Sequence, residues 1–414
     1  MPTAAPSILI LSSGPLCRTP RVLKEARTLG QAGFNVTVMT LANLARFEAY
    51  DREIMSTAPF RKIALDHFSP GWRARGRKTT SRIGTWLARR AVRLGMESAQ
   101  SLGPACSLGR MARKFPADLI LAHTELPFCI ARRLLAQGRR IAADFEDWHS
   151  EDLLPEARKT RPMRLIRRAE RELMRGAAYT STTSQAMAAA LHAAFGGRPP
   201  VVITNSFPLQ PTPASRLPSG PPSFFWFSQT IGPGRGLELF IAAWRRTAQP
   251  SRLCLLGDAG AGYRARLADE VPADRRQYLE FLPLVSPEDL PTVIAQHDVG
   301  LALEPNAPPN KDCTISNKIL QYFNAGLGVI ASNTAGQREA LAHAPGAGLI
   351  VALEDTEKLT RMLDEWLTDR SRLAAMGAAA RRAAEETYCW EKEAPRLVAA
   401  VEAALRSPAP SAVH

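Results

Sequence analysis

The residues best suited to hold an anion lie together in the stretch 310–332. Ser316 has the position and chemistry of the N-cap of a helix that ends before Gly326, and Lys318 lies in the first turn of that helix. A helix N-terminus offers free N–H groups and partial positive charge, which together with an ammonium group suit a phosphate or diphosphate. We therefore expect Ser316, Asn317 and Lys318 to contact a phosphorylated ligand.

A second basic position follows a predicted strand in the same half of the chain. Arg235 lies between Gly234 and Gly236 at the opening of a helix, where a guanidinium can hold a phosphate through two hydrogen bonds. The spacing of these glycines is not that of a dinucleotide fingerprint, and no suitable acid ends the next strand. The pattern therefore argues against an NAD enzyme.

Further polar residues follow predicted strands in the first half, where doubly wound folds bind ligands. Gly14 would let a ligand approach the backbone, and Arg21 lies in the next helix turn. His123 ends a strand and could hydrogen-bond a hydroxyl or a phosphate oxygen, while Asp144 and Glu146 could accept hydrogen bonds from hydroxyls. Ordinary turns, a packed core histidine and solvated surface charges are the alternatives for these residues.

Short β-rich runs alternate with helical patterns along the whole chain, which indicates an α/β protein with parallel sheets. The predicted strands are 7–12, 35–41, 61–67, 118–123, 140–145, 178–183, 201–205, 223–230, 252–257, 278–282, 299–304, 328–332 and 348–352. The predicted helices are 20–32, 83–114, 126–137, 162–175, 184–195, 317–325, 354–369, 370–387 and 390–406.

A length of 414 residues suits two doubly wound (Rossmann-like) domains, each with its own core. The segment 207–222 is rich in Pro, Ser, Thr and Gly and is predicted to be the linker. The expected divisions are an N-terminal domain 1–206, a C-terminal domain 223–387, a final helix 388–406 and a disordered tail 407–414.

Composition narrows the class of protein further. The hydrophobic share of 45% is that of a folded globular protein, and no window approaches the roughly 20 apolar residues of a spanning helix. We expect a cytoplasmic protein. The six cysteines show no Cys-x-x-Cys pair and no histidine at metal-ligand spacing, so reduced structural thiols and no metal site are expected.

The order of several motifs resembles that of GT-B fold glycosyltransferases of the retaining, family 4-like kind (group 1). The matching segments, from the first loop to the last strand–helix pair, are 18–26, 29–38, 118–123, 144–149, 226–237 and 310–332. The resemblance implies two Rossmann-like domains facing across a cleft, with the C-terminal helix crossing back to the first domain. It also implies transfer of a sugar from a nucleotide-diphosphate sugar to a hydroxyl acceptor, with no cofactor and no metal.

The resemblance assigns roles to the residues described above. Catalytic roles fall to His123, Arg235 and Lys318, and the acceptor side is expected to use Arg21, Asp144 and Glu146. Donor binding is expected from Gly14, Gln229, Arg235, Glu304, Ser316, Asn317, Lys318 and Gln321.

Four positions depart from the family pattern. Arg235 replaces the usual lysine, and Gln229 stands near the usual arginine without its charge. Cys313 and Gln321 stand where the family has two glutamates; an amide can still bond ribose hydroxyls, and Glu304 could compensate in part.

The formal net charge of +14 implies acidic partners. Around Trp86 and Leu87, arginines and apolar residues alternate as in interfacial helices, so peripheral contact with an anionic membrane and a lipid-linked or polysaccharide-precursor acceptor are expected. A solvated helix packed on the domain is the alternative. No nucleic-acid binding motif accompanies the charge, so no nucleic-acid partner is expected.

Two other functions remain open at this stage. One is a nucleotide-sugar epimerase or hydrolase of the same fold, which would need no acceptor. The other is a non-catalytic sugar-nucleotide-binding scaffold, which the missing glutamate pair keeps open.

Overall fold

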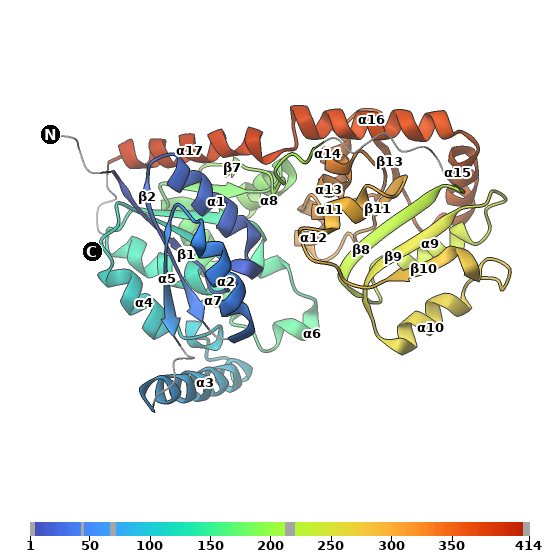
Figure 1. The fold of residues 1–414 in the computed structure, drawn as a ribbon. Helices are drawn as coiled ribbons and strands as arrows, with labels where there is room; N and C mark the ends of the chain where they lie inside the picture. The colour runs from blue at the N-terminus through green and yellow to red at the C-terminus, as the bar shows by residue number, and fades with distance from the viewer. Residues whose placement is uncertain (1–4, 43–44, 67–71, 212–219, 409–414) are drawn as a thin grey trace. The chain divides into compact units, whose positions relative to one another are not determined.

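The computed structural model describes residues 5–42, 45–66, 72–211 and 220–408, and the chain forms two compact units. The first unit contains residues 1–183, 187–203 and 394–414, and the second contains 184–186 and 204–393. Each unit is built on one parallel sheet with helices on its faces, so the predicted fold class of two Rossmann-like domains is confirmed (Figure 1).

The first unit has a seven-stranded parallel sheet in the order β3-β2-β1-β4-β5-β6-β7. Its strands are β1 (Ser7–Leu11), β2 (Asn35–Ala42), β3 (Arg61–Asp66), β4 (Leu119–His123), β5 (Ile141–Phe145), β6 (Tyr179–Thr182) and β7 (Val201–Val202). Its helices are α1 (Pro20–Gln31), α2 (Ala45–Ser56), α3 (Trp72–Arg93), α4 (Ala105–Lys114), α5 (Glu125–Ala136), α6 (Pro155–Arg158), α7 (Met163–Gly176) and α8 (Gln185–Phe195), with 3-10 turns η1 (Leu16–Arg18), η2 (Ala99–Ser101) and η3 (His149–Glu151).

The second unit has a six-stranded parallel sheet in the order β10-β9-β8-β11-β12-β13. Its strands are β8 (Ser223–Ile231), β9 (Arg252–Ala259), β10 (Leu279–Leu282), β11 (Val299–Ala302), β12 (Gly328–Ser332) and β13 (Gly348–Val351). Its helices are α9 (Leu237–Trp244), α10 (Ala261–Asp269), α11 (Leu290–Ile294), α12 (Pro309–Cys313), α13 (Asn317–Ala325), α14 (Ala335–Ala342), α15 (Thr356–Thr368) and α16 (Arg370–Glu386), with the 3-10 turn η4 (Arg276–Tyr278).

Both strand orders reverse direction next to the first strand of the sheet. In the first unit β1 lies between β2 and β4, and in the second β8 lies between β9 and β11. Such a switch point leaves a crevice outside the carboxyl ends of the two central strands, where open parallel sheets bind ligands. The candidate residues can therefore be judged by whether they lie at these two edges.

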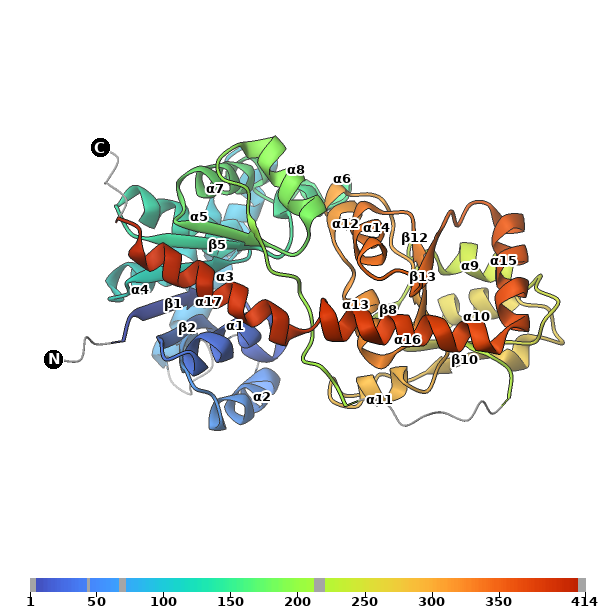
Figure 2. The same cartoon turned by 90° about the horizontal axis from the view of Figure 1, so that it is seen from above.

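The last helix, α17 (Trp390–Arg406), belongs mainly to the first unit, since residues from Ala394 onward group with it. Figure 2 shows α17 running along the first unit and α16 running along α13 in the second. Arg140 donates to the Ser407 carbonyl oxygen at 2.7 Å, which fixes the end of α17. Ser407 is thus ordered, and residues 409–414 of the predicted tail lie outside the described residues.

The predicted linker is ordered where it begins. Trp390 N–H donates to the Phe207 carbonyl oxygen at 3.0 Å, and Gln210 N–H donates to Asn324 Oδ1 at 2.9 Å. The N-terminal part of the first unit extends to Ile203. Residues 212–219 of this segment lie outside the described residues.

One predicted helix was wrong. The continuous helix expected over 83–114 is divided into α3, η2 and α4. Gly95 and Gly103 adopt positive φ values of 81° and 152°, and Pro104 is the N-cap of α4, so the backbone turns twice in this region. Helices α2, α6, α10, α11, α12 and α14 were not predicted.

Among the described residues, no helix is both long and apolar enough to cross a bilayer. All six cysteines are free thiols.

Candidate active site

In the second unit, the polar groups of Glu304, Ser316 and Lys318 meet beside the switch point. Glu304 follows β11, and Ser316 and Lys318 begin α13. Lys318 Nζ lies 2.6 Å from Glu304 Oε1, and Ser316 Oγ lies 3.0 Å from the same oxygen. These three predicted site residues are therefore brought together by the fold.

Ser316 caps α13 as the sequence predicts. Its side chain accepts from the Lys318 backbone N–H at 3.3 Å, and its backbone is extended while α13 begins at the next residue. Gly326 ends the helix with φ at +70°, a left-handed conformation that glycine adopts without strain. The helix is therefore fixed at both ends, and its remaining N-terminal N–H groups and partial positive charge lie beside Lys318.

The Glu304 carboxylate is held in its ionised form. Burial alone would raise its pKa, but the Lys318 ammonium and the hydrogen bond from Ser316 outweigh burial, so the pKa is lowered. Lys318 Nζ also lies 5.5 Å from the centre of the Trp226 ring, whose face favours a cation. Two contacts thus fix the position of the ammonium group.

Arg235 lies in the turn between β8 and α9, at the same edge of the sheet. Gly234 and Gly236 on either side both have φ at +74°, and a Cβ on Gly236 would lie 2.9 Å from Leu353 Cδ1. The turn therefore requires glycine at this position. Arg235 is exposed. Gln229 is also exposed, near the end of β8.

The remaining predicted residues of this unit surround α13. Gln321 Oε1 is buried and makes no hydrogen bond within the described residues. Asn317 Oδ1 accepts from Asn205 Nδ2 at 3.2 Å. Cys313 is buried, its carbonyl oxygen accepts from Ser184 Oγ at 2.6 Å, and burial raises the pKa of its thiol.

In the first unit, Arg21 and Asp144 form a buried ion pair. Arg21 donates to the two oxygens of Asp144 at 2.6 and 2.7 Å and to the Ile203 carbonyl oxygen at 2.9 Å. Ser181 Oγ donates to Asp144 Oδ1 at 2.7 Å. Two parallel N–H···O bonds of this kind are among the strongest polar contacts in proteins.

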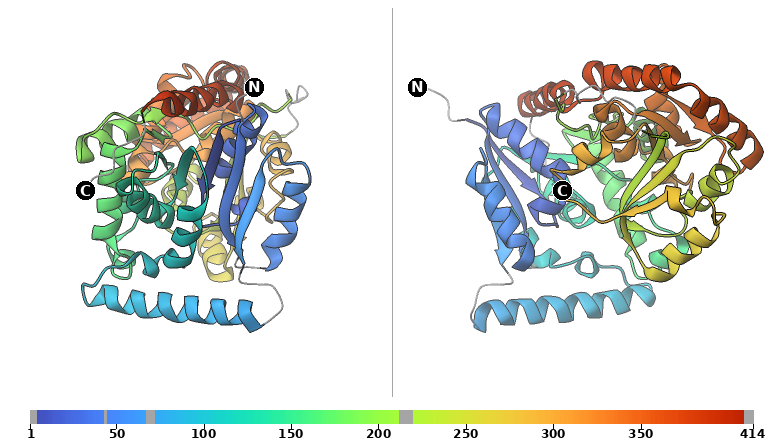
Figure 3. Two further views of the ribbon diagram at one scale, coloured as in Figure 1. Left: turned by 90° about the vertical axis from the view of Figure 1, so that its left-hand side faces the viewer. Right: turned by 45° about the vertical axis from the view of Figure 1, so that its right-hand side comes forward.

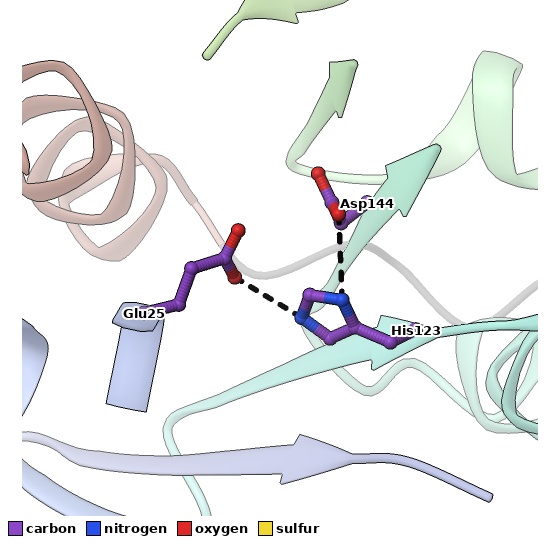
Figure 4. A group of neighbouring side chains, drawn as sticks. All are labelled: Glu25, His123 and Asp144. Carbon is purple, nitrogen blue, oxygen red and sulfur yellow. Dashed lines mark ion pairs between the residues drawn. The ribbon is translucent and has the colours of Figure 1, made fainter. Parts of the chain in front are cut away.

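His123 and Glu25 extend the pair into a cluster of four charged groups. Figure 4 draws Glu25, His123 and Asp144 of this cluster. Its Nε2 lies 3.0 Å from Glu25 Oε2, and its Nδ1 lies 3.3 Å from Asp144 Oδ2. Burial alone would lower the pKa of His123, but Glu25 and Asp144 outweigh it and raise the pKa to about 10. The imidazolium and guanidinium thus balance the two carboxylates.

This arrangement differs from the roles expected for Arg21, His123 and Asp144. All three side chains are buried, and their charged groups are directed at one another rather than at a ligand. Because a buried charge is stable only when it is paired, each of them must satisfy the others. These three residues therefore support the strand ends, and the catalytic role expected for His123 and the acceptor contacts expected for Arg21 and Asp144 stay predictions.

Glu25, His123 and Asp144 are also close enough to share a metal ion, with ligand atoms within 4.8 Å of one another. The chemistry of the cluster does not fit one. Arg21 already donates to both Asp144 oxygens, and its guanidinium would repel a cation bound beside them.

Glu146 lies two residues beyond Asp144, just past the end of β5, and is half-buried. Burial and the nearby Asp147 carboxylate raise its pKa to about 7, against the opposing effect of Arg21. A carboxyl with this pKa can exchange a proton near neutral pH. Glu146 therefore fits the predicted acceptor site better than Asp144 does.

Gly14 lies at the same edge, after β1. A Cβ there would lie 3.0 Å from Thr19 Cγ2, and the Gly14 carbonyl oxygen accepts from Thr40 Oγ1. The glycine therefore serves the packing of this turn, and its contact with the donor stays a prediction.

Sequence reasoning missed Glu25, Ser181 and Thr124. Glu25 lies one helical turn after Arg21, a spacing that could have indicated that the two side chains meet. Thr124 has φ at +68°, which is strained for a β-branched residue, and its Oγ1 lies 2.8 Å from Ser13 Oγ. No sequence signal marks Ser181 or Thr124.

Two family models match the chain over most of its length. A model described as "Glycosyl transferase 4-like domain" matches residues 19–206, and one described as "Glycosyl transferases group 1" matches residues 221–369. The chain belongs to the group 1 glycosyltransferases. The resemblance seen in the sequence is confirmed, and the two models correspond to the two sheets of this glycosyltransferase.

Two curated proteins are similar to parts of this glycosyltransferase. A GDP-mannose-dependent monoacylated alpha-(1-6)-phosphatidylinositol monomannoside mannosyltransferase of Corynebacterium glutamicum is 29% identical over 170 residues, which is 40% of this chain and 43% of that protein. Spore coat protein SA of Bacillus subtilis is 22% identical over 130 residues, which is 31% of this chain and 33% of that protein. The chain thus spans less than half the length of these relatives.

Solved structures resemble the fold over almost the whole glycosyltransferase. Anabaena HepE in complex with UDP and glucose has a TM-score of 0.66 at 18% identity, covering 96% of this chain and 99% of that one. Sucrose-phosphate synthase from Thermosynechococcus elongatus has a TM-score of 0.69 at 15% identity, covering 96% and 98%. At these identities the likeness is one of fold, and the fold is that of GT-B glycosyltransferases.

Proposed function

We propose that the protein transfers a sugar from a nucleotide-diphosphate sugar to a hydroxyl acceptor and retains the anomeric configuration. The observation that carries this proposal is the start of α13, where a capped helix N-terminus and Lys318 lie together beside the switch point of the second sheet. This combination suits a diphosphate, which develops negative charge as the bond to the sugar breaks.

The donor roles follow from the chemistry of the leaving group. Lys318 and the N–H groups next to Ser316 would stabilise the departing diphosphate, and Arg235 would add a mobile cation from the neighbouring turn. Gln321 Oε1, which makes no hydrogen bond in the described part of the chain, would accept from a ribose hydroxyl. We also propose donor contacts for Gly14, Gln229, Glu304 and Asn317, and a reaction that needs no metal.

The transfer balances without a cofactor. The bond between the sugar C1 and the donor phosphate oxygen breaks, the acceptor oxygen bonds to C1, and the acceptor proton passes to a donor phosphate oxygen. On the acceptor side, ionised Glu146 would orient the acceptor by accepting a hydrogen bond from a hydroxyl next to the attacking one.

We propose a lipid-linked or polysaccharide-precursor acceptor. Support comes from the curated mannosyltransferase, whose name gives a phosphatidylinositol mannoside as acceptor, and from the similar fold of WaaG, a glycosyltransferase involved in lipopolysaccharide biosynthesis (TM-score 0.58, 15% identity). Such an acceptor would place the enzyme in the cytoplasm, in peripheral contact with the inner membrane face.

A direct test begins with a thermal-shift screen of the full chain against nucleotide-diphosphate sugars, because a ligand that prefers the native state raises the melting temperature. The donor that binds is then incubated with lipid-linked and soluble saccharide acceptors in the presence of EDTA. Acceptor-dependent sugar transfer with retained configuration is expected. Donor turnover without any acceptor would indicate an epimerase or hydrolase, and donor binding without turnover would indicate a scaffold; either result would overturn the proposal.

A further inference from the structure

Helix α3 carries a row of exposed apolar side chains along one face. Ile83, Trp86 and Leu87 are 53%, 50% and 54% exposed, and Leu94 and Met96, just beyond the end of the helix, are 77% and 60% exposed. The spacing of the first four, at positions i, i+3, i+4 and i+11, places them on one side of a helix. With a rise of about 1.5 Å per residue, the row from Ile83 to Leu94 is about 16 Å long.

The opposite side of α3 is built to pack against the first unit. Gly84 is near Gln100, with an added Cβ at 3.5 Å from its Nε2, and Arg89 donates to the Ser101 carbonyl oxygen at 3.0 Å. Gly84, Ala88 and Val92 are all half-buried. The helix is therefore attached by its small-residue face, and its large apolar side chains point away from the protein.

Arginines lie along one flank of the apolar row. The sequence of α3, residues 72–93, contains eight lysines and arginines and no aspartate or glutamate. Arg82, Arg90 and Arg93 are exposed, and the Arg90 guanidinium lies 4.1 Å from the centre of the Trp86 ring. The outward face thus combines large apolar side chains with positive charge. No acidic residue on the same helix offsets that charge.

Helix α3 lies apart from the rest of the first unit. Figure 3 shows it running along one end of this unit, beyond the sheet and the helices that cover the sheet, and η2 is its main contact. Within the described part of the chain, nothing packs over the exposed side chains of the apolar row. A broad, flat surface could therefore reach this face along its full length.

We propose that α3 docks the protein onto a bilayer surface rich in anionic lipid. Leu, Ile and Trp side chains enter the boundary between headgroups and acyl chains, and arginines beside them contact anionic headgroups. Each cation near such a surface strengthens binding about fivefold, and exposed apolar side chains add affinity that salt does not screen. A nucleic acid would use the cations but would leave the aliphatic row in water.

The test measures co-sedimentation of the full chain with phosphatidylcholine vesicles that contain or lack phosphatidylglycerol. Binding to the anionic vesicles is expected, together with quenching of Trp86 by brominated lipid. Trp86→Phe should lose that quenching, which locates the contact on α3. The assay contains no sugar donor, so its outcome is independent of glycosyl transfer.

Two pairs of variants separate α3 from general effects. Trp86→Ser with Leu87→Ser should weaken binding about tenfold or more, whereas Leu239→Ser with Leu284→Ser, which alters two exposed leucines of the second unit, should not. Arg82→Gln, Arg90→Gln and Arg93→Gln together should weaken binding about a hundredfold. The matched control combines Arg171→Gln, Arg361→Gln and Arg382→Gln, which remove three exposed charges outside α3. This control should weaken vesicle binding far less.

Three results would overturn the proposal. One is the absence of binding to anionic vesicles by the wild-type chain, and another is equal binding by the α3 variants and their controls. The third is that the α3 variants keep vesicle binding but lose a dimer or RNA binding. Loss of a dimer would assign the surface to a second copy of the chain, and loss of RNA binding would assign it to a nucleic acid. The α3 substitutions are all on exposed side chains, so unchanged melting temperatures are expected to show that the variants fold.

Discussion

The Lys318 ammonium lies 2.6 Å from the Glu304 carboxylate, so the cation proposed to hold a diphosphate already has an acidic partner within the second unit. Both side chains are mostly buried, at 12% and 17% exposed. Lys318→Met should therefore lower the free energy of unfolding by about 1–3 kcal/mol, because Glu304 is left without its cation. Glu304→Gln added to Lys318→Met should restore most of that loss.

Denaturant unfolding of wild type, both single variants and the double variant measures this effect as a double-mutant cycle. The double variant should regain stability but not nucleotide binding, which separates the structural role of Lys318 from its ligand role. Recovery of nucleotide binding together with stability would show that Lys318 acts only as a structural partner of Glu304.

Glu146 should give the reaction a pH dependence near neutrality. With a pKa of about 7, the carboxyl ionises as pH rises through that value, and kcat/KM should rise with it if the ionised form orients the acceptor. Glu146→Gln should flatten this part of the profile. If kcat/KM of Glu146→Gln still rises with a midpoint near pH 7, as in the wild type, Glu146 does not belong to the acceptor site.

Ionisation of Glu146 should lower the stability of the protein, although it is expected to raise kcat/KM. Because the folded-state pKa of Glu146 is raised above that of the unfolded chain, the native state binds the extra proton between about pH 4.5 and 7, and stability falls as pH rises through this window. Glu146→Gln should thus stabilise the protein at pH 8, by an amount on the order of 2 kcal/mol, and have little effect at pH 4.5. Thermal unfolding at the two pH values checks this.

The buried cluster of Arg21, Glu25, His123 and Asp144 should make the first unit sensitive to alkali. Since the pKa of His123 is raised to about 10, its contribution is fully present below about pH 6.5 and is lost as pH rises through 10. His123→Gln should lower the free energy of unfolding by about 3–5 kcal/mol at pH 6, because two buried carboxylates lose a cation. The difference from wild type should shrink toward pH 10.5, and a constant difference across this range would contradict a charged His123.

Arg235 is exposed and can be removed without disturbing the fold. Arg235→Ala should leave the melting temperature unchanged and weaken nucleoside-diphosphate binding about tenfold, the usual effect of losing a hydrogen bond between charged groups. Arg361→Ala, at an exposed position on α15, serves as the matched control. Equal affinities of the two variants would place Arg235 outside the donor site.

The sequence predicted the strands well because their pattern is local. The run from Ile8 to Leu11 is fully buried in a parallel sheet, and such runs read as short apolar segments between helical patterns. Both ends of α13 were predictable for the same reason, since the Ser316 cap and Gly326 act through their neighbours in sequence. Helix α2 was missed because much of its support comes from outside it: Asp51 accepts from the Leu16 and Cys17 backbone N–H groups and from Lys62.

The roles of Arg21 and Asp144 could not be read from the sequence. The two residues are 123 positions apart, and only the sheet order brings α1 beside the end of β5. The sequence placed His123 at a strand end, but this position does not show whether the ring faces a ligand or a carboxylate. What decides between the two is burial and charge pairing, which depend on tertiary packing.

Calorimetric titration of nucleoside diphosphates into the full chain, with EDTA present, tests the central claim most directly. The account predicts that at least one of UDP, GDP and ADP binds, and that Lys318→Met weakens that binding tenfold or more even when Glu304→Gln has restored stability. Lys358→Met, at an exposed position on α15, should bind as wild type does. Unchanged affinity in Lys318→Met, or no binding of any nucleoside diphosphate by the wild-type chain, would contradict it.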